Sequence, residues 1–287
     1  MADVVSVIPT FCPDASLLPL AKNLSIHGPL VVSDDASPCS ADPLLLEVSS
    51  LAHVTTIRHR HNVGIARGLN DGLRAALEHG SRWLLTVDQD SLVSDTYVAD
   101  VLTYANQVRM DSLSIGVVGA GQVRDGTADI RYPLTSMGSL DTTPEVIQTG
   151  SLWNVDALAS IGGFDEALGI DAVDAAACVR LRAAGHVIAV AGNLEVAHRI
   201  GSSRSLRLLR RDIMITGHSP ERRSTMLQNR LLLFPEEFKQ SPRHALRTVR
   251  RVAINQAVGL VTERNRFSNA RGTLRGLVPR KADTLEP

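Results

Sequence analysis

The sequence predicts an α/β fold, in which helices flank a sheet with parallel strands. Short runs rich in β-branched residues alternate with segments of helical period through the first half of the chain. The fourth such run ends in Asp88-Gln89-Asp90, an acidic turn at the carboxyl end of a predicted strand. Of the 287 residues, 44% are hydrophobic, which allows a large core and excludes disordered and fibrous classes.

The first half yields four strands and three helices. Strands are expected at residues 4–8, 30–33, 54–58 and 83–87, and helices at 13–24, 43–51 and 64–79. The last helix is the most clearly marked, because Ile65, Leu69, Leu73 and Leu77 form one apolar stripe at four-residue spacing.

The second half is less regular. We expect strands at 115–119 and 187–190, irregular β structure at 129–139, and helices at 155–161 and 174–184, the latter ended by Gly185. After His198 the chain is rich in arginine, with helices expected at 219–234 and 242–261 and with Pro235 and Pro242 as helix breakers. The sequence therefore predicts a domain at 1–201 and a basic helical C-terminal extension at 202–287.

The neutrality of the whole chain hides a division of charge. Lys plus Arg and Asp plus Glu both number 30, but residues 1–198 hold 11 basic and 23 acidic side chains, and residues 199–287 hold 19 and 7. The two parts therefore carry net charges of −12 and +12. This asymmetry predicts an anionic partner for the basic part, which is the acidic domain, a diphosphate or an anionic membrane.

The sequence shows no expected membrane span and no secretory signal. Its apolar runs are far shorter than the ~20 residues that cross a bilayer, and no basic segment precedes an apolar stretch near the N-terminus. Cys12, Cys39 and Cys178 are widely spaced and are expected to be reduced. We expect a cytoplasmic enzyme, with peripheral contact at the inner membrane face through the basic tail as an open alternative.

Asp88 and Asp90 are candidate metal ligands. They lie at the carboxyl end of a predicted strand, where open α/β sheets bind their ligands. Alternate residues of an extended turn can direct two carboxylates to one point, and hard cations such as Mg²⁺ or Mn²⁺ prefer oxygen ligands. The alternative is that Asp88, Asp90 and Asp95 are turn and helix-capping residues, positions that Asp also favours.

Six ordered motifs carry a resemblance to a known family. They are Val31-Val32-Ser33-Asp34-Asp35-Ala36-Ser37, Asn62-Val63-Gly64-Ile65-Ala66-Arg67-Gly68-Leu69-Asn70, Val87-Asp88-Gln89-Asp90-Ser91, Gly150-Ser151-Leu152 with Ile161-Gly162-Gly163-Phe164-Asp165-Glu166, Ile170-Asp171-Ala172-Val173-Asp174, and His198-Arg199-Ile200-Gly201. In this order they resemble the motifs of rhamnosyltransferase-like members of the family-two glycosyltransferases. The resemblance spans residues 4–201.

The resemblance implies the nucleotide-sugar-binding GT-A fold, a Rossmann-like mixed sheet flanked by helices. It also implies a metal-dependent inverting transferase that uses Mg²⁺ or Mn²⁺ and moves a deoxysugar, L-rhamnose, from dTDP-L-rhamnose to an acceptor hydroxyl. The acceptor is left open as a glycan, a lipid-linked intermediate or a small molecule. The oligomeric state is also open, with a homodimer as one option, and no nucleic acid partner is expected.

The resemblance also implies roles for single residues. It implies that the donor is bound by Pro9, Thr10, Asp34, Asn62, Gly64, Arg67, Asp88 and Gln89. It implies an acceptor side made of Gly150, Ser151, Trp153, Phe164 and Asp165, and a metal held by Asp88, Asp90 and His198. Asp174 is implied as the general base that deprotonates the acceptor hydroxyl, with Asp171 as the fallback.

Several of these residues have simpler alternative roles. Asp34 can be a turn residue, and Asp174 can complement the dipole at the start of a helix. Arg67 can pair with a phosphate or with a carboxylate such as Asp88, or it can be a solvated surface residue. A lone histidine such as His198 is ordinarily a packed or surface residue.

The chain also departs from the family pattern near the predicted base. Ala176 and Ala177 stand where the family usually has an acidic residue, often followed by Trp. The acceptor side is therefore altered, and a weak or inactive transferase stays open.

A nucleotidyltransferase and a non-enzymatic binding module are the alternatives to a glycosyltransferase. A nucleotidyltransferase shares the strand order and the acidic metal site, but it needs a Gly-rich, basic loop after the first strand, where this chain has Pro9-Thr10-Phe11-Cys12-Pro13. A non-enzymatic module that binds nucleic acid or an anionic membrane would use the Arg-rich tail. Because aromatic residues make up only 3% of the chain, surfaces for base stacking are scarce.

Overall fold

The computed structural model of the protein describes residues 3–108, 114–125, 128–130, 132–198, 204–208, 211–215, 219–262 and 276. It separates into two units, Met1–Arg199 and Ile200–Pro287. The boundary falls where the sequence changes from an acidic to a basic composition.

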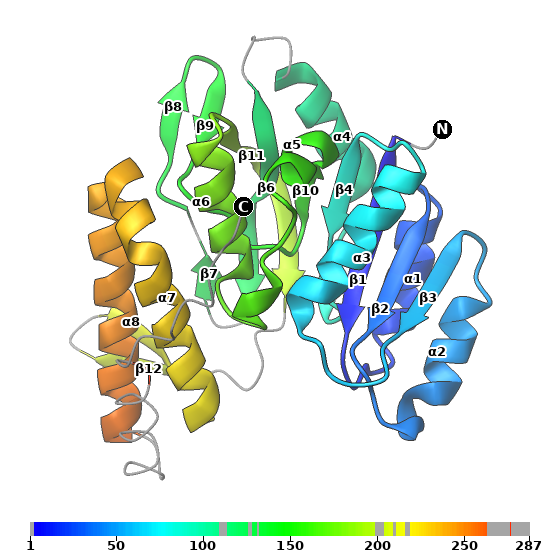
Figure 1. The fold of residues 1–287 in the computed structure, drawn as a ribbon, viewed down its shortest axis with the longest axis horizontal. Coiled ribbons are helices and arrows are strands. Elements are labelled where there is room, and N and C mark those ends of the chain that lie inside the picture. Colours follow the sequence, from blue (N-terminus) through cyan, green and yellow to red (C-terminus); the bar gives the residue numbers. More distant parts are fainter. Residues whose placement is uncertain are drawn as a thin grey trace. The chain divides into compact units, whose positions relative to one another are not determined.

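A mixed sheet, eleven-stranded in the described part of the chain, forms the centre of the first unit. Its strands are β1 (Val4–Thr10), β2 (Leu30–Asp34), β3 (Val54–Arg58), β4 (Trp83–Thr86), β5 (Ser91–Leu92), β6 (Ile115–Asp125), β7 (Ala128–Ile130), β8 (Thr135–Met137), β9 (Leu140–Thr142), β10 (Ser151–Asn154) and β11 (Val187–His198). The main order is β3-β2-β1-β4-β10-β6-β11-β9-β8 (Figure 1). β1 to β4 are mutually parallel, whereas β10 runs antiparallel to its neighbours β4 and β6.

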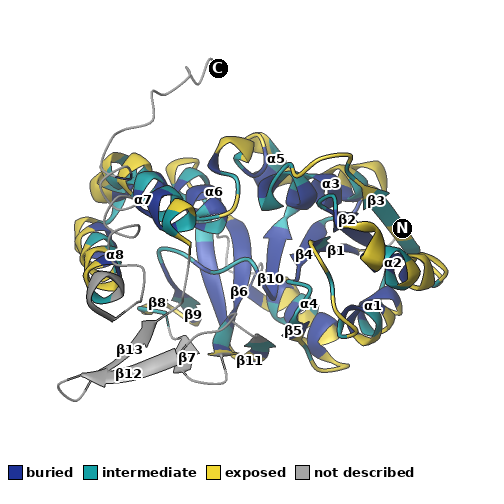
Figure 2. Cartoon of the chain, turned by 90° about the horizontal axis from the view of Figure 1, so that it is seen from below, coloured by how far each residue is buried: buried dark blue, intermediate teal, exposed yellow. Residues whose placement is uncertain are grey.

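Helices cover both faces of this sheet. They are α1 (Leu17–Ser25), α2 (Asp42–Ser49), α3 (Ile65–Glu78), α4 (Tyr97–Val108), α5 (Val155–Ser160) and α6 (Val173–Ala183), with the short 3₁₀ turns η1 (Cys39–Ala41) and η3 (Glu166–Leu168). Figure 2 shows the buried strands between one layer of α3, α5 and α6 and another of α1, α2 and α4. On the second face, side chains of α1, α2 and α4 such as Leu24, Val48 and Tyr97 join Ile8 and Leu85 of the sheet in one apolar cluster.

Helix α3 lies close to β1 and β2 because the residues that face these strands, Gly68 and Gly72, have no side chain. A Cβ at Gly72 would lie 2.5 Å from the Val7 Cβ, and one at Gly68 would lie 3.1 Å from the Pro9 Cβ. The predicted apolar stripe is confirmed only in part, since Leu69 and Leu73 are buried but Leu77 is 49% exposed. The closest packing of this helix therefore comes from residues without a side chain.

The predicted order of strands and helices is confirmed up to β4, and the elements beyond it differ more. β11 continues from the expected strand to His198, because it pairs with β6 from Val187 to Ala197 and with β5 at Ala197 and His198. The sequence does not predict α4 or β10. β10 has only four residues and gains its pairing from strands on both sides, a context that a local pattern does not carry.

The described part of the second unit consists of a hairpin and two helices. β12 (Arg204–Leu208) pairs antiparallel with β13 (Arg211–Ile215), so the extension is not helical throughout. The helices are α7 (Pro220–Gln240) and α8 (Pro242–Thr262). Within the described ranges, no helix is both long and apolar enough to span a membrane.

Pro235 does not end a helix, contrary to the sequence prediction. It lies inside α7, whereas Pro242 does separate α7 from α8. Because proline has no N–H group, the carbonyl of Leu231, four residues earlier, loses its helical hydrogen bond. Leu231 and Pro235 are both exposed, so water can bond to this carbonyl instead.

We expect the substitution Gly72→Ala to lower the melting temperature. Alanine in a helix ordinarily stabilises by about 1 kcal/mol relative to glycine, but the clash with buried Val7 should outweigh this by about 1–3 kcal/mol. Thermal unfolding followed by circular dichroism measures the change, roughly 2–4 °C per kcal/mol for a domain of this size. Gly192→Ala is the control, because no heavy atom lies within 4 Å of its added Cβ. Equal melting temperatures for the two variants would contradict the close packing of α3.

Candidate active site

The first loops of the site follow β1 and β2, which end side by side. Thr10 is the register partner of Asp34. The fully buried Asp34 carboxylate accepts hydrogen bonds from the Thr10 hydroxyl at 3.4 Å, from the Ser37 hydroxyl at 2.5 Å and from the Ser37 N–H at 3.1 Å. Arg58 Nε lies 3.4 Å from the same carboxylate. Asp34, expected to contact the nucleotide, thus engages its oxygens with the chain and shapes the loop after β2.

The acidic turn after β4 is tied to two other segments. Gln89 accepts a hydrogen bond from the Phe11 N–H at 2.9 Å and donates one to the Phe11 carbonyl at 3.0 Å. The Asp88 N–H donates to the Thr149 hydroxyl at 3.0 Å. Asp88 and Asp90 are both half-buried. The turn therefore joins the loop after β1, which contains Phe11, to the segment that precedes β10.

Gln148 connects the predicted metal carboxylate to the predicted base. Its side-chain Nε2 donates to Asp88 Oδ1, and its backbone N–H donates to Asp174 Oδ2 at 3.2 Å. Asp174 is the second residue of α6 and also accepts from the Ala175 N–H at 2.7 Å. Sequence reasoning missed Gln148, although it lies two residues before Gly150, where the recognised motif begins.

Two neutral side chains, those of Cys178 and Tyr132, lie near Asp174. Cys178 is one turn further along α6, and burial raises the pKa of its thiol, with a further increase from the charge of Asp174. Burial also raises the pKa of Tyr132, whose hydroxyl accepts from the Ile147 N–H at 3.2 Å. Both side chains therefore stay protonated near neutral pH. All three cysteines of the chain are unpaired thiols.

The two alanines that depart from the family pattern are core residues. Ala176 is 1% exposed and Ala177 is fully buried in α6. An acidic residue or Trp at these positions would require a different packing around the helix. The departure is therefore built into the core of this chain.

His198 and Asp171 approach the site from β11 and from the loop before α6. The backbone of His198 pairs with Ser91, next to Asp90, and the His198 side chain lies outside the described residues. Asp171 is half-buried and precedes Ala172, which has a left-handed backbone with φ of 65°. Non-glycine residues with positive φ are strained, and such strain is common at functional sites.

The residues before α3 that are predicted to bind the sugar donor are held in place by contacts within the chain. Asp35 accepts hydrogen bonds from the N–H of Val63 at 2.5 Å and of Gly64 at 3.1 Å. Its carboxylate thus holds the backbone of the two residues that precede α3. Gly64, with φ of 84°, lies so close to Gly169 that a Cβ would be 2.9 Å from the Gly169 carbonyl oxygen. Asn62 is exposed.

Arg67 has carboxylate partners other than the expected Asp88 or a phosphate. Its Nη1 lies 3.4 Å from Glu166, and its Nε lies 3.8 Å from Asp71. The side chain is 40% exposed. It therefore belongs to the contact between α3 and the loop that contains Glu166.

The aromatic residues predicted for the acceptor side are buried. Trp153 is fully buried and Phe164 is 2% exposed, with their rings edge to face at 5.0 Å between centroids. Trp153 Nε1 donates to the Thr86 hydroxyl at 2.9 Å. Neither ring is accessible to a substrate in this structure, so their role is corrected to packing beneath the site.

The remaining acceptor-side residues shape the backbone. Gly150 has φ of 71°, and its carbonyl accepts from the Tyr97 hydroxyl at 2.5 Å. Ser151 is fully buried and donates to the Ile147 carbonyl at 2.5 Å. Asp165 accepts from the Ala167 N–H at 3.0 Å and so caps η3.

The groups at this edge of the sheet suit a divalent cation. Asp88 and Asp90 offer carboxylate oxygens from alternate positions of one turn, and the backbone brings His198 beside that turn. Oxygen ligands with an imidazole nitrogen suit Mg²⁺ or Mn²⁺. Gln148 orients the Asp88 carboxylate, as outer partners do for metal ligands. The donor set therefore fits the cation expected from the sequence.

Comparisons with known proteins agree with this architecture. Residues 29–153 match the family model described as glycosyl transferase family 2. The chain is 24% identical over 250 residues to the dTDP-rhamnosyl transferase RfbF of Shigella flexneri, a match that covers 81% of this chain and 80% of that protein.

Two solved structures are similar across almost the whole chain. S. aureus TarS 1–349 in complex with UDP-GlcNAc superposes with a TM-score of 0.64 at 14% identity, covering 96% of this chain and 79% of that chain. The mannosyltransferase PcManGT from Pyrobaculum calidifontis, in complex with GDP-Man and Mn²⁺, gives 0.58 at 14% identity, covering 96% and 84%. In a longer TarS chain the match covers 44% of that chain.

The sheet order, the flanking helices and these likenesses define the GT-A fold of glycosyltransferases. Residues 29–153 resemble a family 2 glycosyltransferase domain, and the chain is a glycosyltransferase.

Proposed function

We propose that the protein is a metal-dependent inverting glycosyltransferase that moves L-rhamnose from dTDP-L-rhamnose to an acceptor hydroxyl. The observation that carries this proposal is the position of Gln148. It donates one hydrogen bond to Asp88, a proposed metal ligand, and another to Asp174, the proposed base. Inverting transfer needs a leaving-group site and a base close to one sugar, and Gln148 couples two residues that suit these roles.

Asp174 is the proposed general base. In an inverting transfer the acceptor oxygen attacks the anomeric carbon on the face opposite the leaving nucleotide, and a carboxylate takes the proton of the attacking hydroxyl. The backbone N–H groups of Gln148 and Ala175 hold both oxygens of Asp174 in place. The fallback base is Asp171, three residues earlier.

Asp88, Asp90 and His198 would hold Mg²⁺ or Mn²⁺ at the carboxyl end of β4. When bound, the cation neutralises negative charge on a departing diphosphate. Two glutamines orient the proposed ligands. Gln148 donates a hydrogen bond to Asp88, and Gln89 ties the turn that contains Asp88 and Asp90 to Phe11.

The choice of donor rests on the relative from Shigella flexneri, whose name specifies dTDP-rhamnosyl transfer. A panel of dTDP-L-rhamnose, UDP-GlcNAc and GDP-mannose, each with Mn²⁺, Mg²⁺ or EDTA, tests it through release of nucleoside diphosphate. We expect release from dTDP-L-rhamnose with a cation and little from the other two donors. Preference for another donor would overturn this assignment and leave the fold untouched.

We expect Asp90→Asn to weaken binding of Mn²⁺ at least about tenfold, because even the loss of an outer partner of a metal ligand has effects of about 10–100-fold. Calorimetric titration of the protein with Mn²⁺ in the presence of dTDP measures this without relying on turnover. Asp95→Asn is the matched control, since Asp95 is an exposed carboxylate in the same segment. Similar Mn²⁺ affinities for both variants would remove Asp90 from the metal site.

For Asp174→Asn we expect dTDP-L-rhamnose to bind as in the parent while sugar transfer falls about 10²–10⁴-fold, the usual contribution of a general base. Binding is measured by calorimetry and dTDP release by a coupled assay, with water as the acceptor where no sugar acceptor is known. If release continues at the parent rate, the base lies elsewhere, and Asp171→Asn is the next variant to test.

We also propose that α8 contacts an anionic membrane surface. Its exposed side carries Arg243, Arg247 and Arg250 together with Leu246, 56% exposed, and Ile254, 40% exposed. The α8 sequence contains no acidic residue. Basic side chains interspersed with apolar ones are typical of helices that lie on anionic bilayers, and this surface would bring the enzyme to a lipid-linked acceptor.

Co-sedimentation with vesicles tests this contact. We expect Arg247→Glu with Arg250→Glu to reduce binding to vesicles containing phosphatidylglycerol at least about tenfold, since each basic residue near such a surface contributes about 1 kcal/mol. Lys22→Glu with Arg60→Glu makes the same change of charge on exposed residues of the first unit and should bind as the parent does. Equal loss in both double variants would indicate a nonspecific effect of net charge, and binding to RNA but not to vesicles would overturn the proposal.

A further inference from the structure

Helix α3 holds the loop that leads to the proposed base. This loop, residues 163–169, follows α5 and ends two residues before Asp171. Three positions of α3 contact it through polar groups. The Ala66 N–H donates to the Gly169 carbonyl at 3.5 Å, Arg67 pairs with Glu166, and Asn70 bonds to Phe164 and Glu166.

Asn70 makes the most specific of these contacts. Its Oδ1 accepts from the Phe164 N–H at 2.9 Å, and its Nδ2 donates to the Phe164 carbonyl at 2.9 Å. Nδ2 also donates to Glu166 Oε1 at 2.9 Å. The side-chain amide thus hydrogen-bonds to both the N–H and the carbonyl of Phe164, which fixes the position and the orientation of that peptide segment. Gly163 leaves the room for it, because a Cβ there would lie 2.7 Å from Asn70 Oδ1.

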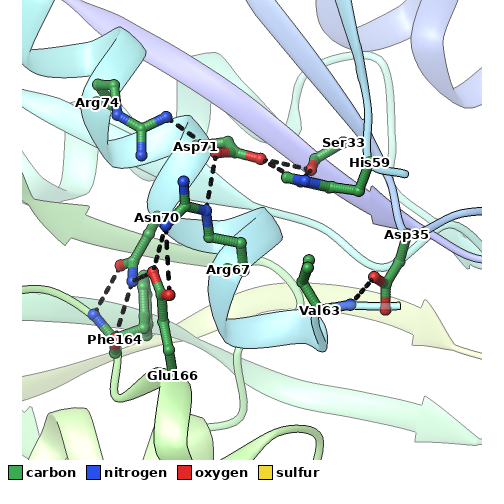
Figure 3. A network of polar contacts seen from close by, with 10 residues as sticks. All are labelled: Ser33, Asp35, His59, Val63, Arg67, Asn70, Asp71, Arg74, Phe164 and Glu166. Atoms are coloured by element: carbon green, nitrogen blue, oxygen red, sulfur yellow. Dashed lines mark hydrogen bonds and ion pairs between the residues drawn. The ribbon is translucent and has the colours of Figure 1, made fainter. Parts of the chain in front are cut away.

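The other side of α3 is fixed to the sheet. Asp71, the residue after Asn70, is 2% exposed and accepts from the Ser33 hydroxyl at 2.8 Å. His59 Nε2 and Arg74 Nη1 lie 2.8 Å and 3.0 Å from its oxygens. Figure 3 shows these two groups of contacts on adjacent parts of the helix, with Asn70 directed to Phe164 and Asp71 directed to Ser33. Neighbouring residues of α3 therefore connect the strand ends to the 163–169 loop.

The loop in turn leads to the start of α6. Arg180 of α6 donates to the Ile161 carbonyl and, at 3.4 Å, to the Gly163 carbonyl, so the chain before the loop is held as well. Between the loop and Asp174 lies Ala172, with φ of 65°. A short connection with both ends fixed and one strained residue has few ways to move, so a shift of the loop would displace Asp174.

We propose that Asn70 is a positioning residue for the proposed base Asp174, acting through the 163–169 loop. The proposal rests on the assignment of Asp174 under the proposed function. Asn70 closes a chain of contacts from the carboxyl ends of the strands, through Asp71 and α3, to the start of α6. Asn70 is the last residue of the motif Asn62–Asn70, and this role would align the proposed base with the donor loops at the strand ends.

The test is Asn70→Asp, which keeps the shape and one hydrogen bond to the Phe164 N–H but replaces both donated bonds with repulsion. We expect dTDP release from dTDP-L-rhamnose, with Mn²⁺ and water as the acceptor, to fall at least about tenfold, because small misplacement of a catalytic group can reduce rates by about 10². The Kd of the donor should stay within about twofold. Hydrogen exchange of the amides in residues 163–174 should become faster, a readout that needs no turnover.

The matched control is Gln240→Glu. Gln240 of α7, in the second unit, also donates a side-chain amide hydrogen bond to a carboxylate, that of Glu236 at 3.0 Å. It should leave the rate of dTDP release and the exchange of residues 163–174 unchanged. Adding Glu166→Gln to the Asn70→Asp variant supplies an amide donor to the introduced carboxylate and should restore part of the rate.

The outcomes separate this inference from the proposed function. If Asp174→Asn is inactive while Asn70→Asp turns over within twofold of the parent, Asn70 does not position the base. Unchanged exchange of residues 163–174 in Asn70→Asp would overturn the inference whatever the activity. A parallel loss of donor affinity and rate would make Asn70 a general structural residue. If Asp174→Asn keeps the parent rate, the proposed base is wrong, and the positioning role that depends on it falls with it.

Discussion

The buried carboxylate of Asp71 is the interaction on which the first unit depends. A charge without access to water must be paired and hydrogen-bonded, and Asp71 meets this demand with Ser33, His59 and Arg74. These partners come from β2, from the end of β3 and from α3 itself. The bonds therefore fix the rotation of α3 on the sheet, and the glycines at 68 and 72 set its distance from the sheet. With both fixed, Arg67 and Asn70 of the helix can hold the 163–169 loop beside it.

The site is formed largely by contacts within the chain. Asp35 accepts hydrogen bonds from the backbone just before α3, Asp34 bonds to Thr10 and Ser37, and Gln89 bonds to Phe11. These side chains act on backbone geometry. Such preorganisation leaves fewer groups to be ordered when a substrate binds, so that binding energy is available for the reacting sugar.

The sequence predicted the fold class and the order of elements up to β4, because each strand there is a short run rich in β-branched or apolar residues that pairs with its sequence neighbours or with β1. It also placed Asp88 and Asp90 at a strand end. It could not predict that β10 pairs on both sides or that Trp153 and Phe164 pack against each other, since those facts depend on partners far along the chain. Gln148 was hidden for the same reason. Its role exists only because the fold brings Asp88 and Asp174 to its side chain and its N–H.

The antiparallel strand β10 affects the order in which the sheet can form during synthesis of the chain. It lies between β4 and β6, so neither strand gains that neighbour until residues 151–154 have been synthesised. Until then, a nascent chain with β1 to β4 in place would expose the buried strand Trp83–Thr86 as an open edge, which can pair with other chains. The Thr86 hydroxyl can donate to the carbonyls of Gln148 and Ser151 only when that edge is covered. The edge of β4 is therefore covered before the proposed site is complete, because Asp174 and His198 are synthesised after β10.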